Sequence, residues 1–336
     1  MRERRGRMFG FLKKQRDTAK KIEAFNQGLS SLKVSKSLRE NVDMMKQLFQ
    51  DVDIMKYKHV AKDGEEAYAI AYSDGLVNSA IINDSILRPL MLCPRPPKGE
   101  DLMRRLTLEI VQINECERVD GFKKIVAAVT YGDTVLFADG CAEAAILNTK
   151  GFALRAVAEP DNEKTLSGPR EGFNESLMQG LSMLRRRART NDFKIRQMSF
   201  GRRTETGVAV CYFDSVVNRP VLKELLRRLE AVDIDGVLDS NYLTELIRDH
   251  RLSPFRTIGY TERPDVVIGK LLEGRIAILV DGTPNALTLP YLFIENFQSN
   301  EDYYLSFYYT SFARILRLIG FFMTVTVPGL YIAVVA

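Results

Sequence analysis

The sequence predicts an α/β (α+β) protein made of two similar lobes, followed by the start of an α-helical membrane domain. The first observation is an internal similarity: AIAYSDGLVN at 69–78 aligns with AVCYFDSVVN at 209–218, and GDTVLFADG at 132–140 aligns with GRIAILVDG at 274–282. The second is that helix and strand patterns recur in the same order in both halves. The third is an uncharged stretch at 318–336. The first two observations predict an internal duplication, with chance convergence of two strand patterns as the alternative, and the third predicts the membrane segment.

Composition and pattern divide the chain into five parts. They are a basic tail at 1–34, a first α/β lobe at 35–158, a linker at 159–167, a second α/β lobe at 168–300, and a juxtamembrane segment with a truncated first transmembrane helix at 301–336. The linker is assigned to a polar stretch that contains Pro160, Asp161 and Asn162, which are typical of connections between elements.

The first lobe is predicted to begin with a helix of about three turns. Ser37 and Glu40 have the spacing of a capping box, and apolar residues follow at helical spacing. Strands are expected at 54–60 and 67–72, and Lys62-Asp63-Gly64 is a turn signal between them.

Three helices and a hairpin complete the predicted first lobe. The helices are expected from Asn78 or Ser79 to Leu90, from Leu102 to Cys116, and from Asp120, as a capping residue, to Gly132. Residues 135–138 and 144–147 are expected to pair through a tight two-residue turn at Asp139-Gly140.

The second lobe is predicted to repeat this order. Ser167, Gly168 and Pro169 are expected to open a helix that carries apolar residues to Leu184. The remaining elements are strands at 193–200 and 208–213, a helix from Asn218 and Pro220, a helix at 240–248, a helix that follows Thr261 and Glu262 and ends at Gly274, and a hairpin from 275–280 around Asp281-Gly282.

The two ends of the chain carry different membrane signals. Basic residues crowd the first 21 positions, which favours a solvated, poorly ordered tail; attachment to anionic lipid of a cytoplasmic leaflet is the sharper hypothesis. Residues 318–336 approach the length of about 20 apolar residues that spans a bilayer, with a buried core helix as the alternative. Arg314 and Arg317 precede this stretch, so the positive-inside rule places the upstream chain in the cytoplasm.

Composition and motifs argue against several functions. The 48 basic and 43 acidic residues leave a net charge of only +5, which does not favour nucleic acid as a partner. The four cysteines form no C-x-x-C pair, and His59 and His250 fall in different lobes, so no metal site is expected. The sequence contains neither a phosphate-binding G-x-x-x-x-G-K-[ST] motif nor a G-x-S-x-G elbow. We therefore expect no enzymatic activity, no catalytic residues and no cofactor.

Charged residues at connections of the second lobe are the candidate contacts for a ligand or a subunit. Arg202, Arg203 and Glu205 occupy a predicted strand connection, where a guanidinium could bind a carboxylate bidentately. The second set consists of Glu262, Arg263, Asp265 and Asp281. Structural ion pairs, hairpin turns and helix caps are the alternative for both sets. Two lobes with a short linker also suggest a cleft, because ligand pockets favour domain interfaces.

Several segments of the second half resemble one protein family. They are SGPREGFNESL (167–177), GRRTET (201–206), VDIDGVLDSNYLTELI (232–247), SPFRTIGYTERPDVV (253–267), LLEGRIAILVDGTPNALTLPYLFIENFQSNEDYY (271–304) and LRLIGFFMTVTVPGLYIAVV (316–335). These segments resemble the A subunits of spore germinant receptors. The resemblance is dense from Gly168 onward and only architectural before it.

The resemblance implies a subunit of a nutrient receptor in the spore inner membrane, with its soluble lobes on the cytoplasmic (core) side. In that family, A subunits act with B and C subunits to convert nutrient binding into ion release and germination. The implied partners are these subunits, further A subunits in a homo-oligomer, membrane lipid and a small nutrient ligand. A related spore membrane protein associated with the dipicolinic acid channel, and a purely scaffolding module, are the alternatives. The family continues with further membrane helices, so this chain is expected to stop within the first.

Overall fold

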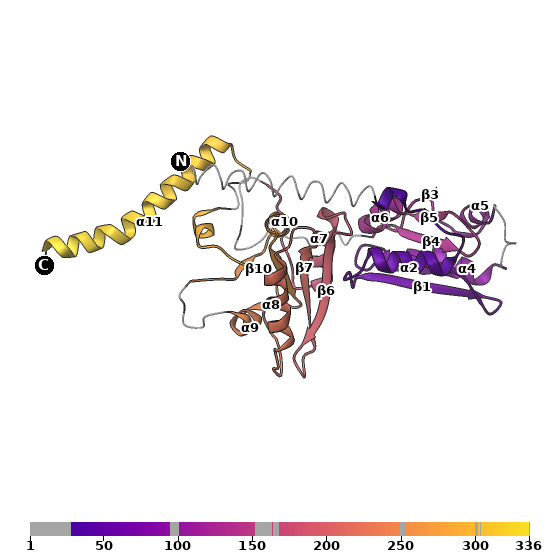
Figure 1. Cartoon of the computed structure of the whole chain (residues 1–336), viewed down its shortest axis with the longest axis horizontal. Helices are drawn as coiled ribbons and strands as arrows, with labels where there is room; N and C mark the ends of the chain where they lie inside the picture. The colour runs from indigo at the N-terminus through magenta and orange to yellow at the C-terminus, as the bar shows by residue number, and fades with distance from the viewer. Residues whose placement is uncertain are drawn as a thin grey trace.

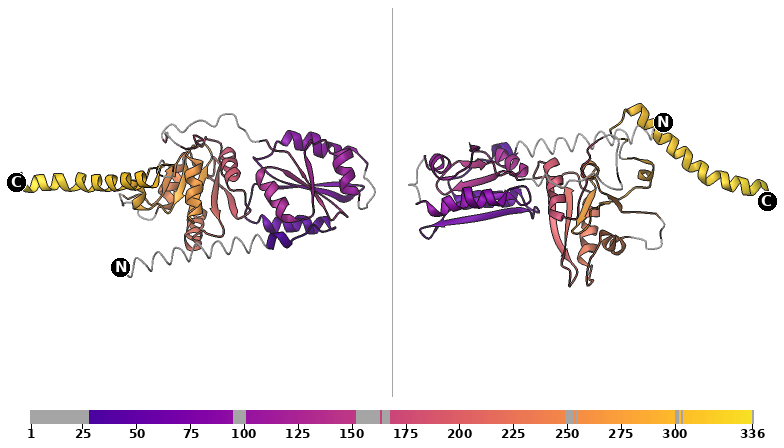
Figure 2. Two further views of the ribbon diagram at one scale, coloured as in Figure 1. Left: turned by 90° about the horizontal axis from the view of Figure 1, so that it is seen from above. Right: turned by 180° about the vertical axis from the view of Figure 1, so that it is seen from behind.

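A computed structural model of the protein describes residues 28–94, 101–151, 163, 168–248, 253, 255–299, 302 and 304–335. The molecule is elongated, with the first lobe at one end, the second lobe in the middle, and a long C-terminal helix leaving the far side of the second lobe (Figure 1). Two further views show the same succession (Figure 2). Most of the expected basic tail and of the expected linker lies outside the described residues.

The first lobe is a five-stranded antiparallel sheet with the strand order β1-β2-β4-β5-β3. Its strands are β1 (Met55–Lys62), β2 (Glu65–Ser73), β3 (Cys116–Val119), β4 (Thr134–Ala138) and β5 (Ala144–Leu147). Its helices are α2 (Leu38–Leu48), α3 (Ser79–Ile81), η1 (Ile82–Leu87), α4 (Arg88–Leu92), α5 (Leu102–Arg105), η2 (Leu106–Ile110) and α6 (Phe122–Tyr131).

The second lobe is also a five-stranded antiparallel sheet, with the order β6-β7-β9-β10-β8. Its strands are β6 (Phe193–Phe200), β7 (Thr206–Phe213), β8 (Gly259–Thr261), β9 (Ile276–Val280) and β10 (Ala286–Leu289). Its helices are α7 (Leu177–Arg187), α8 (Arg219–Glu230), α9 (Ser240–Ile247), α10 (Pro264–Leu272) and η3 (Phe293–Phe297).

The two sheets have equivalent topologies, strand for strand, as the internal duplication predicts. Local signals also coincide in the two copies. Asn78 caps α3 and Asn218 caps α8, each with a side chain that accepts main-chain amides of the first helical turn. Gly132 and Gly274 both end a helix with a positive φ, of 100° and 86°, a conformation that glycine adopts at no steric cost.

Two expectations for the first lobe are wrong. The helix expected to reach Cys116 ends at Ile110, and Cys116 begins β3 at the edge of the sheet. The residue before α6 that takes the capping position is Gly121, which has no side chain to offer. Asp120 instead binds Lys33 through an ion pair. A partner 87 positions away in the sequence thus takes the carboxylate that we expected to cap the helix.

Two further expectations fail on turn chemistry. The second lobe's first helix begins at Leu177, with the Ser176 hydroxyl accepting from the amide of Gln179, rather than at the Ser-Gly-Pro segment upstream. Gly168 lies in a bend and Pro169 in irregular chain ahead of it. The closing hairpins have longer connections than two residues, at 139–143 and 281–285, although Gly140 and Gly282 take the positive φ that the Asp-Gly signal indicated.

Main-chain hydrogen bonds join the lobes along the edge of the second sheet. The connection between α2 and β1 runs beside β6, where Val52 forms a parallel bridge with Ile195. The Asp53 amide donates to the Ile195 carbonyl at 3.0 Å, and the Ile195 amide donates to the Asp51 carbonyl at 3.0 Å. The Gln197 amide donates to the Asp53 carboxylate at 2.6 Å. The first lobe therefore covers the edge strand, whose unpaired amides would otherwise face water.

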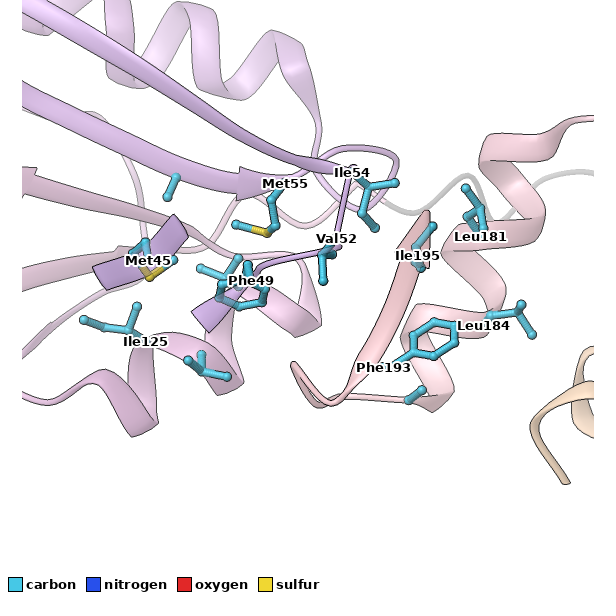
Figure 3. Close-up of a cluster of buried hydrophobic side chains, with 14 of the residues drawn as sticks. Met45, Phe49, Val52, Ile54, Met55, Ile125, Leu181, Leu184, Phe193 and Ile195 are labelled. Carbon is cyan, nitrogen blue, oxygen red and sulfur yellow. The ribbon is translucent and has the colours of Figure 1, made fainter. Parts of the chain in front are cut away.

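Apolar side chains fill the same junction (Figure 3). Val52 and Ile54 from the first lobe point toward Phe193 and Ile195 of β6, and Leu181 of α7 lies behind them. All five are buried and belong to one hydrophobic cluster that includes residues of both lobes. Where these elements meet, the junction that we expected to form a cleft is thus packed with apolar side chains.

The C-terminal helix α11 (Phe307–Val335) extends away from the second lobe (Figure 1). It is long and apolar enough to cross a membrane, with a mean hydropathy of 2.1 over its most apolar window, and none of that window is buried against the lobes. The alternative of a buried core helix is therefore wrong for this segment. Pro328 lies inside the helix, as membrane helices tolerate.

Candidate functional site

The charged residues singled out in the second lobe all lie toward one end of its sheet. Antiparallel pairing brings the start of β7 beside the end of β9, and the start of β10 beside the end of β8. The connections at 201–205, 262–263 and 281–285 therefore share that end. They do not form one cluster, because β6 and β8 are opposite edges of the five-stranded sheet and neighbouring strands are about 4.8 Å apart.

At the β6 edge, the arginines bond the connection between β6 and β7 to the loop that follows α8. Arg202 binds Asp233 bidentately, with its Nε 2.8 Å from the carboxylate. The main-chain amide of Arg203 donates to the carbonyl of Asp235 at 2.9 Å, and Glu205 takes a positive φ of 45° in the turn. The Arg202 pair is exposed, so its net contribution to stability is small.

Asp281 serves as a helix cap. Its carboxylate accepts from the Leu177 amide at 2.9 Å, at the start of α7. A carboxylate at a helix N-terminus satisfies an amide without a helical partner and meets the positive end of the helix dipole. Asp281 thus has the contacts of a helix cap, and its role as a ligand or subunit contact stays a prediction.

Glu262 and its neighbours form hydrogen bonds with the chain that enters the second lobe. The Glu262 side chain is buried, and its carbonyl accepts from the Phe173 amide at 2.8 Å. The Glu163 carboxylate accepts from the Thr261 hydroxyl at 2.6 Å and from the Glu262 amide at 3.2 Å. Burial raises the pKa of Glu163, against the opposing effect of these hydrogen bonds. The chain that enters the second lobe is thus attached at the start of α10.

Arg263 is the centre of a buried network at this corner. Its side chain is fully buried and donates to the Asp265 carboxylate at 2.8 and 3.2 Å and to the Pro169 carbonyl at 3.0 Å. The Tyr304 hydroxyl donates to the same carboxylate. Burial alone would raise the pKa of Asp265, but the hydrogen bonds from Arg263 and Tyr304 outweigh it, so this pKa lies below its ordinary value.

Tyr304 also packs against the chain that arrives from the first lobe. Gly168 has a φ of 109°, and a Cβ atom on it would lie 2.8 Å from two carbons of the Tyr304 ring. Glycine is therefore the residue that fits, on grounds of both backbone conformation and space. The entry to the second lobe, the start of α10 and the segment before α11 meet at this point.

Glu295 holds η3 against the lobe. Its buried carboxylate binds both Lys270 of α10 and Arg275 before β9, and it accepts from the Leu292 amide at 2.7 Å. Burial would raise the pKa of Glu295, yet the bond from Lys270 and the other donors bring it below its ordinary value.

Asp302 fastens α11 itself. Its side chain is 1% exposed and accepts from Arg314 at 2.8 Å and from Arg317 at 2.9 and 3.1 Å. Arg317 also donates to the Phe297 carbonyl at 3.2 Å. Burial opposes ionisation of Asp302, but its arginine partners lower the pKa below the ordinary value. Asp265 thus links Arg263 to Tyr304, Glu295 links η3 to the second lobe, and Asp302 links the segment before α11 to α11. We name the half-buried Asp265 and the buried Glu295 and Asp302 the junction carboxylates.

Sequence reasoning found part of this site. Arg263 and Asp265 were singled out, and the structure places them in the network. Tyr304, Glu295 and Asp302 were missed. Arg314 and Arg317 carried a signal, because two arginines on one helix face three residues apart need a partner when they are held against protein. Nothing local marks Asp302 as that partner.

The second lobe also contains a polar hollow of about 550 Å³ beside α9. Among the residues lining it are Asp239, Glu245, Arg248, Arg256, Tyr260 and Asn285. None of the seven residues singled out from the sequence lines it. Within the described part of the chain, no group of three His, Cys, Asp or Glu side chains is placed to hold a metal ion.

Comparisons with known proteins agree with this architecture. A crystal structure of the N-terminal domain of the A subunit of the Bacillus megaterium spore germinant receptor GerK3 is similar, with a TM-score of 0.61 and 32% sequence identity. The match covers 78% of this chain and 97% of that one. The two-lobed fold with two antiparallel sheets is therefore shared with a germinant receptor domain.

Curated relatives match a larger share of the chain. Spore germination protein KA of Bacillus subtilis (strain 168) is 36% identical over 304 residues, which is 89% of this chain and 55% of that protein. The membrane protein YfkQ of the same organism is 34% identical over 304 residues, covering 90% of this chain and 58% of that protein. The chain thus spans between half and two thirds of the length of these relatives.

The sequence model described as Bacillus/Clostridium GerA spore germination protein matches residues 40–336, which include both sheets and α11. Because this match covers most of the chain, the protein belongs to the GerA family of spore germination proteins.

Proposed function

We propose that the complete protein is the A subunit of a nutrient germinant receptor in the spore inner membrane, and that its lobes couple ligand sensing or subunit assembly to ion release. The family membership and the germinant receptor domain of known structure support a germination role. The observation that carries the coupling is the set of junction carboxylates, which attach the second lobe to the start of α11.

The physical basis of coupling is the placement of these bonds. Arg314 and Arg317 lie on one face of α11, and both bind a carboxylate that is almost wholly buried. Arg263 binds the carbonyl of Pro169 on the linker side and Asp265 on the helix side. A displacement of Pro169 or of the start of α10 would therefore act through Asp265 on Tyr304, which precedes α11.

A comparison of two aspartates tests this role. Asp302 and Asp233 each bind arginine, but Asp302 joins α11 to the segment that leads from η3, whereas Asp233 binds Arg202 of an exposed hairpin. In spores that depend on the complete protein, Asp302→Asn should slow nutrient-induced release of dipicolinic acid, and Asp233→Asn should not. The protein level in the spore membrane must be equal in both. Equal germination of both variants and the unaltered protein would overturn the coupling role.

The proposed partners are B and C subunits, further A subunits, membrane lipid and a small nutrient. The polar hollow beside α9 supports a nutrient as ligand, since its lining carries both carboxylates and guanidinium groups. Calorimetry of the protein with germinant amino acids and sugars tests this point. Heat exchange that is lost in Arg256→Ala would support ligand binding at the hollow, and silence across the panel would assign the lobes to subunit contacts.

We propose that the lobes lie on the cytoplasmic, core side of the membrane. Arg314 and Arg317 flank the uncharged part of α11, and positive residues favour the cytoplasmic end of a span. Labelling of the exposed Cys116 by a membrane-impermeant thiol reagent should occur only when the cytoplasmic face is open. Labelling from the outer face would contradict this orientation.

A scaffold is the second candidate function, and the apolar junction between the lobes favours it. Packed interiors do not deform continuously, so lobes joined in this way suit a fixed platform for subunit assembly. Light scattering with and without partner subunits distinguishes the two roles when it is combined with the germination assay: assembly that is unchanged in Asp302→Asn, with slow germination, indicates coupling. A protein associated with the dipicolinic acid channel is a further alternative within the family, and it would release dipicolinic acid without a nutrient response of its own.

We also propose that the chain acts without enzymatic turnover. Cys211 is fully buried, and burial raises its pKa to about 12, so its thiol is protonated and out of reach at neutral pH. His59 lies beside Glu66 on the surface of the first sheet, 3.3 Å away. Hydrolysis of model ester, phosphate or glycoside substrates by the purified protein would contradict this view.

A further inference from the structure

Four exposed apolar side chains gather next to α11. Leu292, Phe293 and Ile294 stand at the start of η3 and are 49%, 50% and 51% exposed, and Phe255 is 61% exposed. The rings of Phe255 and Phe293 are in edge-to-face contact, with centroids 5.7 Å apart. We call these four residues the apolar wedge. Contiguous exposed apolar surface of this kind marks a contact with a partner or a membrane.

The apolar wedge is continuous with the uncharged part of α11. Phe293 contacts Phe321 with ring centroids 6.1 Å apart, and Phe297 contacts it at 5.1 Å. Phe321 is four residues beyond Arg317, the last charged residue of the chain, which is about 6 Å along a helix axis. The wedge therefore reaches the level at which α11 has already become wholly apolar.

Polar groups of the same segment point the other way. Glu295 is 7% exposed and turned toward Lys270 and Arg275 of the lobe. Asp302 holds Arg314 and Arg317 at the base of the helix. The segment is thus amphipathic, with its charges against the protein and its apolar side chains outward. The outward apolar side chains of this segment would be unfavourable in water, because burial of apolar area is the main favourable term in folding and association.

Exposed tyrosines also surround the start of α11. Tyr304, Tyr308 and Tyr309 are 41%, 84% and 60% exposed around the start of α11. Tyrosine favours the membrane–water boundary because its ring is apolar and its hydroxyl needs water or head groups. Along the chain, these tyrosines precede Arg314 and Arg317, and the uncharged part of α11 that contacts Phe293 follows them.

From the contact between the apolar wedge and the uncharged part of α11 we infer that the wedge inserts into the membrane boundary beside α11, so that the second lobe sits directly on the lipid surface. The occupant of the exposed apolar patch is lipid acyl chain, not a second protein. The inference rests on α11 as a membrane helix under the proposed function and adds a second contact to it. With two points of contact, the lobe is oriented against the membrane, and tilting of α11 must either withdraw the wedge or drive it deeper.

The chain offers a clean test because it contains no tryptophan. Phe293→Trp places one fluorophore in the wedge, Phe322→Trp places one in the uncharged part of α11, and Leu108→Trp places one on the first lobe at a site that is 72% exposed. Each variant is reconstituted in vesicles of phosphatidylcholine and phosphatidylglycerol, with and without lipids brominated near the head group. Circular dichroism should be the same for all three.

The expected result is strong quenching of Phe293→Trp by the brominated lipids, with blue-shifted emission, and none for Leu108→Trp. The inference would be overturned if Phe293→Trp showed water-like emission and no quenching while Phe322→Trp was quenched. That result would leave α11 in the membrane. The inference would also be overturned if the emission of Phe293→Trp was blue-shifted but not quenched by brominated lipid, and if the blue shift disappeared on dilution of the protein within the vesicles. That result would indicate a second protein copy on the wedge. Absence of quenching at Phe322→Trp would instead sink the proposed membrane helix.

Discussion

The ring of Tyr304 occupies the space into which a side chain on Gly168 would project. A Cβ atom at this glycine would lie 2.8 Å from two ring carbons, and the φ of 109° already disfavours any other residue. Because Gly168 follows the linker and Tyr304 precedes α11, this contact joins the connection between the lobes to the connection with the membrane helix. Coupling between the two connections can therefore be tested at this contact.

Gly168→Ala should destabilise the second lobe by about 1–3 kcal/mol, through the left-handed backbone and the collision with Tyr304. Gly282→Ala is the matched control, since Gly282 has a φ of 83° but open space around its Cβ position. Gly282→Ala should lower the free energy of unfolding only through the left-handed backbone, because its Cβ atom meets no neighbour. Urea unfolding measures both, and a cost for Gly168→Ala no greater than for the control would contradict the packing argument. In a protein that also carries Tyr304→Ala, Gly168→Ala should lower the free energy of unfolding no more than Gly282→Ala does.

Ile195→Ala should weaken the attachment of the two lobes. Ile195 is fully buried in the junction, and deletion of buried methyl groups costs about 2–5 kcal/mol. Hydrogen exchange at the amide of Asp53, which donates to the Ile195 carbonyl, should speed up. Leu225→Ala removes a side chain that is 4% exposed in the other core of the second lobe and should leave that amide protected. Equal exchange in both variants would mean that the junction is not a separate contact.

Asp281→Ala should lower the free energy of unfolding by about 0.5–2 kcal/mol, because the Leu177 amide loses its acceptor. Asp281→Asn should lose much less, since the amide oxygen can still accept. Thermal unfolding compares them. If both variants are as stable as the original protein but subunit assembly fails, Asp281 acts as a contact residue, as first supposed, rather than as a cap.

The junction carboxylates should make the attachment of α11 sensitive to acid. Asp265, Glu295 and Asp302 all have pKa values below their ordinary range in the folded protein. A carboxyl group with a depressed folded pKa stabilises the fold above its ordinary pKa, about 4, and loses that contribution as the pH falls through the folded value. The junction should therefore hold at neutral pH and loosen only below about pH 4.

Proteolysis in the segment 291–299, followed from pH 7 to pH 3 with an acid-tolerant protease, measures this loosening. Asp302→Asn should show a smaller dependence on pH, because one of the three titrating groups is gone. Cleavage that increases between pH 7 and pH 5 would contradict the assignment, since all three carboxyl groups are ionised in that range.

Single-cysteine variants should differ widely in their reaction with thiol reagents. Cys116 is exposed on the edge strand β3, whereas Cys211 is buried and has a pKa raised by burial to about 12. The first should react readily with an alkylating agent in the native protein and the second only after unfolding. Rapid reaction at Cys211 would show that the core of the second lobe opens, and would reopen the possibility of a functional thiol.

Short-range signals in the amino-acid sequence were enough to predict most of the elements. Asn78 and Asn218 mark helix starts, Gly132 and Gly274 mark helix ends, and the β6–β7 pair follows from alternating apolar residues. These signals act over a few residues, through one side-chain bond or one backbone angle, so they can be recognised without knowledge of the fold. The duplication then predicted one topology for both lobes.

Other features required the folded chain, because their partners are far apart. Tyr304 and Asp265 are 39 positions apart, and Gln197 and Asp53 are 144 apart. No local pattern indicates which of many charged residues will pair, since the energy of a buried ion pair depends on burial and geometry that arise only when both lobes pack. The patterns in the sequence predicted a membrane helix and two α/β lobes. Only the packing of the folded chain determined that the junction between the lobes is closed and that a buried carboxylate binds the arginines of the helix.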